Sequence, residues 1–160
     1  GSTFQCTTSI GGGVQGESCS SDSQCASGFV CTLLSGGSGR CREYCRTNSD
    51  CSAGRCAFSL AAGIGSCSTS CNPTSSVFTC SNVSDSCYVF SISGGLAEVT
   101  DCQPSGFRSP GASCTAVTDC GTDTCAGGFC RDVCPSGNSS SCQGLTCNAV
   151  SGWTTYGVCR

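Results

Sequence analysis

The apolar positions of this chain lie in short runs and not in the long periodic stretches of a helix. In most cases a few apolar or β-branched residues lead into a glycine turn, and a return run ends on a cysteine. The outgoing runs are Thr32-Leu33-Leu34, Ala57-Phe58-Ser59-Leu60, Tyr88 to Ile92 and the shortened Ala126 to Phe129, and Trp153 to Val158 is the return run of a fifth unit. The pattern predicts five short β-hairpins with little helix.

Each predicted hairpin lies between the third and fourth cysteines of a four-cysteine repeat, whose cysteines we label a, b, c and d. Twenty of the 21 cysteines form five such repeats, and Cys6 is left over. The repeats are Cys19, Cys25, Cys31, Cys41; Cys45, Cys51, Cys56, Cys67; Cys71, Cys80, Cys87, Cys102; Cys114, Cys120, Cys125, Cys130; and Cys134, Cys142, Cys147, Cys159. We therefore predict an N-terminal arm (1–18), a block 19–102 of three repeats (19–41, 45–67, 71–102), a linker (103–113) and a block 114–160 of two repeats (114–130, 134–159).

The composition leaves little material for a conventional hydrophobic core. Leu, Ile, Val and Phe number only 25 of 160 residues, too few to offset chain entropy by burial alone. Ten disulfides are expected to replace that core, since closing a loop of about 15 residues contributes roughly 3 kcal/mol in the chain-entropy model. Such cross-links persist in an oxidising compartment, so we expect a secreted or cell-surface protein.

Two local signals recur between the repeats. Four hairpins close on Gly-x-Cys, which predicts a glycine with positive φ or close to a disulfide; these glycines are Gly39, Gly65, Gly128 and Gly157. Aspartates recur just ahead of b, at Asp22, Asp50 and Asp119. Side chains there are expected to cap turns, with calcium binding as the alternative.

The a, b, c, d spacing with a glycine-turned hairpin between c and d resembles the first four cysteines of EGF-like modules. The resemblance spans Cys19 to Cys159 and implies bridges a to c and b to d in every repeat. The chain departs from EGF-like modules because three residues, or eleven across the linker, follow d, and no fifth and sixth cysteines exist. From the residues alone, the three pairings that four cysteines allow stay open. The acidic and amide residues that precede the first cysteine in calcium-binding EGF modules are missing, so calcium is not implied.

Composition and spacing argue against several kinds of chemistry. Neither Cys-x-Cys nor Cys-x2-Cys occurs and histidine is absent, so we predict no metal, no cofactor and no thioredoxin-type centre. Without His or Lys only carboxylates remain as general bases, and we predict no enzyme. A net charge of −3 without a basic cluster disfavours nucleic acid, and no apolar stretch is long enough for membrane insertion.

The surface residues point to sugars and to assembly. Ser and Thr number 30 and 16, and sequons at Asn82 and Asn138 are glycosylation candidates. Cys6 is a candidate for an intermolecular bond. If Cys6 bonded to a repeat cysteine of a neighbouring chain, one repeat cysteine would be left as a free thiol. A Cys6 to Cys6 dimer, a bond to another protein or a small-molecule cap would leave no cysteine unpaired. A free Cys6 thiol is the alternative.

Two functions remain. The first is a structural subunit of an extracellular filament, appendage or surface coat that associates with itself. The second is a secreted binding module, a ligand, adhesin or inhibitor, that presents a variable hairpin. Its contact surface would comprise Tyr88, Phe90, Ile92 and Leu96 of the third hairpin, then Trp153 and Tyr156 of the fifth. In a chain so poor in core residues, packing of these aromatic side chains on the disulfides is the alternative.

Overall fold

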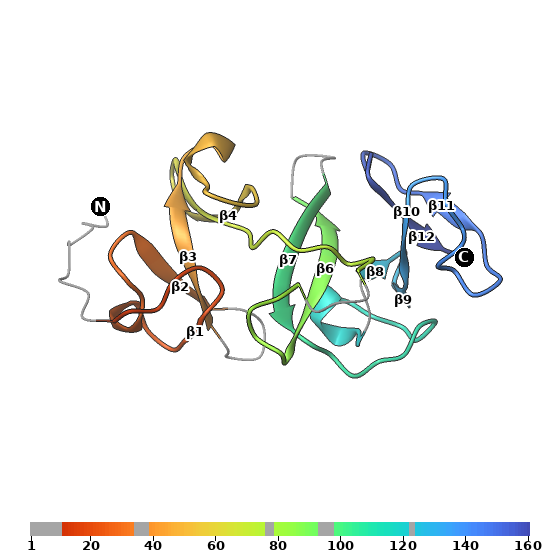
Figure 1. Cartoon of the computed structure of the whole chain (residues 1–160), viewed down its shortest axis with the longest axis horizontal. Helices are drawn as coiled ribbons and strands as arrows, with labels where there is room; N and C mark the ends of the chain where they lie inside the picture. Colours follow the sequence, from red (N-terminus) through yellow and green to blue (C-terminus); the bar gives the residue numbers. More distant parts are fainter. Residues whose placement is uncertain (1–10, 34–38, 76–78, 93–97, 122–123) are drawn as a thin grey trace.

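The computed structural model describes residues 11–33, 39–75, 79–92, 98–121 and 124–160, which form a row of β-hairpins along the long axis of the molecule (Figure 1). The first two repeats lie at one end, the third hairpin stands in the middle, and the last two repeats lie at the other end. Helix within these residues is limited to single 3-10 turns. The predicted small disulfide-rich fold, with hairpins and little helix, is confirmed.

The strands place c directly opposite d in all five hairpins, at Cys31 and Cys41, Cys56 and Cys67, Cys87 and Cys102, Cys125 and Cys130, and Cys147 and Cys159. The strands are β1 (Ser18–Cys19), β2 (Phe29–Leu33), β3 (Gly39–Cys45), β4 (Cys56–Ala61), β5 (Ile64–Cys67), β6 (Asp85–Ser91), β7 (Glu98–Pro104), β8 (Thr124–Ala126), β9 (Phe129–Arg131), β10 (Val133–Pro135), β11 (Cys147–Ala149) and β12 (Tyr156–Cys159). The 3-10 turns η1 (Asp22–Gln24), η2 (Asn48–Asp50) and η3 (Val117–Asp119) each end just before b.

Ten disulfides join a to c and b to d in every repeat, the pairing that the EGF-like resemblance implies. Because c and d already face each other, the two bonds tie one hairpin to the preceding a and b segments. Three of the four sulfur atoms in each repeat lie within 4.8 Å of one another, so the two disulfides pack together. Every d cysteine is buried, whereas every c cysteine is partly exposed.

Cysteines are 12 of the 18 buried apolar residues in the part of the chain that the structure describes. The packed clusters of the first, fourth and fifth repeats consist of cysteines, with Phe29 added in the first. The other buried apolar side chains among the described residues are Val30, Tyr88, Val89, Val99, Val133 and Val158. The described residues therefore form no continuous hydrophobic core, and each repeat is held mainly by its own pair of disulfides.

The recurring Gly-x-Cys has two different causes. A Cβ at Gly39 would lie 2.6 Å from the Cys31 sulfur, and one at Gly157 would lie 2.9 Å from the Cys147 sulfur, so the a to c bridge needs the space. Gly128 has open space but a φ of +81°, because it forms the shortened turn of the fourth repeat. Both physical reasons predicted for this glycine occur, at different positions.

In three of the repeats a third strand, which includes the a cysteine, pairs with the hairpin. In the first repeat β1 pairs with β3, in the second the end of β3 pairs with β5, and in the fifth β10 pairs with β12. Strand β3 thus runs from the first repeat into the second without a break, and one sheet has the order β1-β3-β5-β4 with β2 also on β3. The first and second repeats are therefore one continuous unit.

Two equivalent segments, which we call lead-ins (residues 11–18 and 106–113), precede the first and fourth repeats. Gly16 N donates to Cys41 O over 2.9 Å, and Gly111 N donates to Cys130 O over 2.8 Å. Both lead-ins read Gly-x4-Gly-x-Ser ahead of the a cysteine. Residues 11–18 of the predicted arm and 106–113 of the predicted linker are thus hydrogen-bonded to the repeats that follow them.

Side chains ahead of b cap backbone groups, as predicted, but from two positions. Asp50 Oδ2 accepts from Arg46 N over 2.7 Å, and Asp119 Oδ2 accepts from Thr115 N over 2.8 Å. Gln24 holds the equivalent place in the first repeat, where it accepts from Ser20 N. Asp22 instead accepts from Cys31 N over 2.8 Å, as Asn48 does from Cys56 N and Ser139 from Cys147 N.

These second contacts protect the outer strands of the hairpins. Cys147 faces Cys159, and the Cys159 N–H points away from it, to Asp132 O beside β10. The two residues are thus a pair without mutual hydrogen bonds, and the Cys147 N–H also points away from the hairpin. A side chain occupies this outward N–H in the first, second and fifth repeats. The fourth repeat has Val117 at that position, and its outer strand β8 lies against the third hairpin, where Thr124 Oγ1 donates to Val89 O. Where no neighbouring repeat covers an outer strand, a side chain thus accepts from its outward N–H, which leaves this group unavailable for pairing with another strand.

Candidate functional site

Two arginines of β3 form buried ion pairs with the third repeat. Arg40 and Arg42 are two residues apart and lie on one face of the strand. Arg42 Nη1 and Nη2 donate to Asp101 Oδ1 and Oδ2 over 2.6 and 2.8 Å, and neither side chain is exposed. Arg40 Nε donates to Asp85 Oδ2 over 2.7 Å and its Nη2 contacts Asp85 Oδ1. The third repeat is thus bound to β3 by two bidentate contacts, the geometry in which arginine is most selective.

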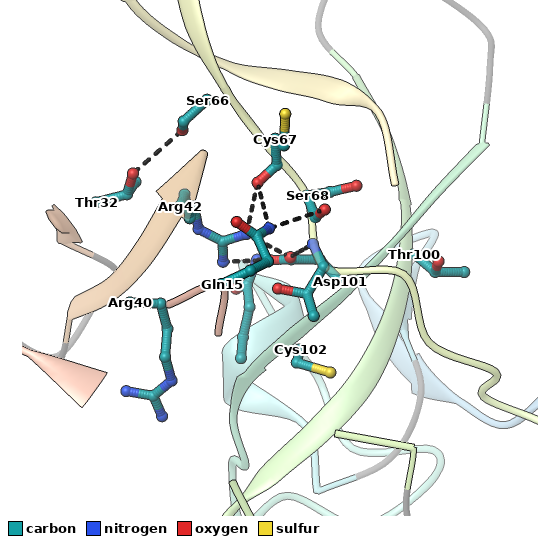
Figure 2. A network of polar contacts seen from close by, with 12 residues as sticks. Gln15, Thr32, Arg40, Arg42, Ser66, Cys67, Ser68, Thr100, Asp101 and Cys102 are labelled. Carbon is teal, nitrogen blue, oxygen red and sulfur yellow. Dashed lines mark hydrogen bonds and ion pairs between the residues drawn. The ribbon is translucent and has the colours of Figure 1, made fainter. Parts of the chain in front are cut away.

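Asp101 is the centre of this network, as Figure 2 shows. Besides Arg42 it accepts from Thr69 N over 2.8 Å and from Gln103 Nε2 over 2.8 Å. Arg42 Nη1 also donates to Cys67 O over 3.2 Å, and its guanidinium lies 4.4 Å above the Phe58 ring. The four donors satisfy a carboxylate that has lost all contact with water, which is the condition for a buried charge to be tolerated.

The first lead-in joins the same network. Gln15 Nε2 donates to Cys67 O and Ser68 O over 3.3 and 3.2 Å, and Gln15 Oε1 accepts from Glu43 N over 2.8 Å (Figure 2). One amide side chain thereby connects the lead-in to both ends of the second repeat. Buried polar contacts consequently fix the first three repeats to one another.

The third hairpin also contacts the fourth repeat, through its strand β6. Tyr88 is fully buried; its hydroxyl donates to Cys120 O over 2.7 Å and accepts from Gly106 N over 3.0 Å. Thr124 Oγ1 donates to Val89 O over 2.6 Å. Tyr88 therefore fills the junction between two repeats, and its predicted place on a contact surface is wrong, because its hydroxyl is needed inside.

The fifth repeat also reaches the third hairpin. Trp153 Nε1 donates to Ser91 Oγ over 2.9 Å, and Glu98 accepts from Thr155 N and Tyr156 N over 2.9 and 3.2 Å. Burial, and to a lesser degree the charge of Glu98, raises the pKa of Tyr156 above its ordinary value. The third repeat therefore contacts all four others, and we call it the central repeat (71–102).

The other residues predicted for a contact surface divide three ways. Phe90 packs on Phe58 with ring centroids 6.2 Å apart, and Trp153 and Tyr156 are half-buried on the central repeat. Ile92 is half-buried. Leu96 lies outside the described residues. Most of these aromatic side chains serve contacts between repeats within the chain.

The most exposed apolar side chains lie elsewhere. Phe107 in the second lead-in is 90% exposed and Val83 is 81% exposed. Leu33 is 63% exposed and Leu145 is 53% exposed. These side chains are scattered over different repeats, and Phe107 is the aromatic one of the four.

The two sequons differ in their surroundings. Asn138 is exposed, and its Oδ1 accepts from Ser140 N over 2.9 Å. Asn82 is half-buried, and its Nδ2, the atom that carries a sugar, donates to Ser18 Oγ of the first lead-in over 3.0 Å. Only Asn138 offers its amide nitrogen without a contact to another repeat.

Cys6, the candidate for an intermolecular bond, lies outside the described residues. The clustered repeat sulfurs have the proximity that a metal site needs, yet each of them is in a disulfide, which leaves no thiolate to act as a ligand. Within the described ranges, no helix has the length and apolar character to cross a lipid bilayer.

Comparison with known proteins adds no further assignment: no protein-family model, curated protein or solved structure matches the chain. The protein is a small, β-rich chain whose disulfides lie in tandem cysteine groups. Ten disulfides are typical of proteins that fold in an oxidising environment.

Sequence reasoning missed the polar junctions of the central repeat. Arg40 and Asp85 are 45 residues apart, and Arg42 and Asp101 are 59 residues apart, so no local pattern links them. One signal was present: Cys-Arg-acidic-x-Cys joins d to the next a at both Arg42 and Arg131. A recurring arginine beside a buried cysteine points to a buried partner charge.

Proposed function

We propose that the protein is a structural subunit of an extracellular filament, appendage or surface coat. The observation that supports this most is the set of contacts around the central repeat. Its buried aspartates bind β3 on one side, and Tyr88, Val89 and Glu98 contact the last two repeats on the other. Repeats fixed in this way form a stiff elongated body, which suits a building unit.

The chemistry of the chain supports the same proposal. Disulfides within every repeat resist unfolding outside the cell, where reductants are scarce. A surface rich in Ser and Thr remains hydrated without many charges. We further propose that Asn138 carries an N-linked sugar in a eukaryotic host, because its side chain is exposed, and that Asn82 stays unmodified because it contacts Ser18.

Electron microscopy of the native material tests the filament. Fibres with a regular axial repeat are expected, and a dispersed monomer at high concentration would contradict the proposal. Intact mass under non-reducing conditions reports a Cys6 to Cys6 dimer and the sugar mass together. Loss of that sugar mass in Asn138→Gln, but not in Asn82→Gln, is expected.

A binding module remains the second candidate, and the exposed Phe107 favours it, because a bare aromatic ring in water is a common feature of recognition surfaces. Deleting the tip of the third hairpin distinguishes the two functions. A binding module that uses this tip loses its partner, whereas a filament subunit loses polymerisation. Phe107→Ser extends the test to the lead-in.

A further inference from the structure

The chain contains the same two-repeat unit twice. We call residues 11–67 module 1 and residues 106–159 module 2. Both begin with a Gly-x4-Gly-x-Ser lead-in, and both join their repeats through Cys-Arg-acidic-x-Cys. The equivalent backbone hydrogen bonds also match, since Gly13 N donates to Gln24 O and Arg108 N to Asp119 O, each over 3.1 Å. Arg131 of module 2 is therefore the structural counterpart of Arg42.

Arg131 shares two features with Arg42, a phenyl ring under its guanidinium and a buried Nε, but its ring belongs to Phe129 on its own strand β9 and it lacks a carboxylate partner among the described residues. Each guanidinium lies over a phenyl ring, Arg42 at 4.4 Å from Phe58 and Arg131 at 5.5 Å from Phe129. Each Nε is buried and has no acceptor among the residues that the structure describes. Arg42 gives its terminal nitrogens to Asp101, whereas Arg131 has no ion pair with any residue in the part of the chain that the structure describes. Arg131 is half-buried, so its guanidinium is partly dehydrated without that compensation.

Phe129, two residues before Arg131 on β9, indicates which second contact a partner must make. Phe129 takes the place that Arg40 has in module 1, and it is 45% exposed. A partner on this face thus meets one cation and one aromatic ring, in place of two cations. The chain itself provides the model for such a partner, because the central repeat contacts module 1 through Asp101, the residue directly before its d cysteine.

We propose that Arg131 and Phe129 form a docking surface for a further four-cysteine repeat, on a partner chain of the assembly, that carries an aspartate immediately before its fourth cysteine. This inference rests on the proposed function, since it supplies the contact by which one subunit would hold the next. The aspartate accepts both terminal nitrogens of Arg131, as Asp101 does from Arg42. An apolar residue of the same repeat covers Phe129.

A grafted chain tests the surface without any need for polymers. Residues 68–104 are appended after Cys159 in place of Arg160, which copies the connection between the second repeat and the central repeat. That connection is available, because Arg160 N donates to Thr146 O as Ser68 N donates to Arg55 O. The graft contains no arginine, so modification by phenylglyoxal, read by mass spectrometry, reports Arg131 without interference.

Docking predicts that Arg131 reacts at least tenfold more slowly in the grafted chain than in the unmodified chain. A matched graft with Asp101→Asn in the appended copy restores the fast reaction. Equal rates in the two grafts overturn the proposal. Native mass must first show two disulfides beyond the ten of the unmodified chain.

If the graft does not form its two additional disulfides, the phenylglyoxal reactivity of Arg131 in the unmodified chain tests the proposal instead. An open surface requires that Arg131 react faster than the buried Arg40 and Arg42. Protection of Arg131 equal to that of Arg42 means that the surface is closed, and the proposal fails. A lack of fibres in the microscope contradicts the filament alone, whereas the graft result concerns this surface alone.

Discussion

Replacing Asp101 by asparagine removes one charge from the buried pair that holds the central repeat to β3. The shape of the side chain is nearly kept, but the Arg42 guanidinium, which has no exposed surface, loses its compensation. Breaking a buried pair in this way costs about 3–5 kcal/mol. The disulfides still hold each repeat, so the cost falls on the junction, which opens more often while the repeats stay folded.

Amide hydrogen exchange at Thr69 measures that opening, because its N–H donates to Asp101 Oδ1 over 2.8 Å. A loss of about 3–5 kcal/mol raises the exchange rate of this amide by about two to four powers of ten. The control is the double variant Arg42→Met with Asp101→Asn, which removes both charges but keeps a side-chain oxygen to accept from Thr69 N, and it is expected to exchange far more slowly than the single variant. An unchanged Thr69 rate in Asp101→Asn, or a double variant as open as the single one, would refute this reasoning.

Three further results are expected. Limited reduction followed by alkylation labels the a to c bonds first, because every c cysteine is partly exposed and every d cysteine is buried, and early labelling of d would contradict this. Gly39→Ala lowers the yield of correctly paired protein, because its Cβ would lie 2.6 Å from the Cys31 sulfur, whereas Gly12→Ala, with open space, does not. Backbone hydrogen bonds from Arg46 and Thr47 lower the pKa of Asp50, so this cap contributes stability above the unfolded aspartate pKa of about 3.9 and loses it as the pH falls through the lower folded value. The Thr47 amide shift should then be constant from neutral pH to about pH 5, and a midpoint above 3.9 would be inconsistent with it.

The cysteine spacing was sufficient to predict the hairpins, because each c and d brackets a short apolar run with a glycine turn. The capping role of Asp22, Asp50 and Asp119 also followed from their place ahead of b. Grouping them by residue type put Asp22 in the wrong position, since Gln24 is the counterpart of Asp50. A carboxylate, an amide and a hydroxyl all accept a backbone N–H, so residue identity does not reveal the equivalence.

Contacts between repeats were beyond the reach of the sequence. Tyr88 looks the same in a pattern whether its hydroxyl meets solvent or Cys120 O, and only the position of the fourth repeat decides. Arg42 and Asp101 likewise meet because two repeats pack side by side. The linker interpretation of residues 103–113 failed to foresee the bonds of Gly106 and Arg108 to the fourth repeat, although the matching lead-in ahead of Cys19 was a visible signal.

Small-angle X-ray scattering of the oxidised chain tests most directly whether the five repeats form one stiff body. The account predicts a single elongated particle whose distance distribution matches that calculated from the interlocked repeats, at every salt concentration, because the buried pairs escape screening. A distribution that broadens like a string of independently moving repeats would contradict it.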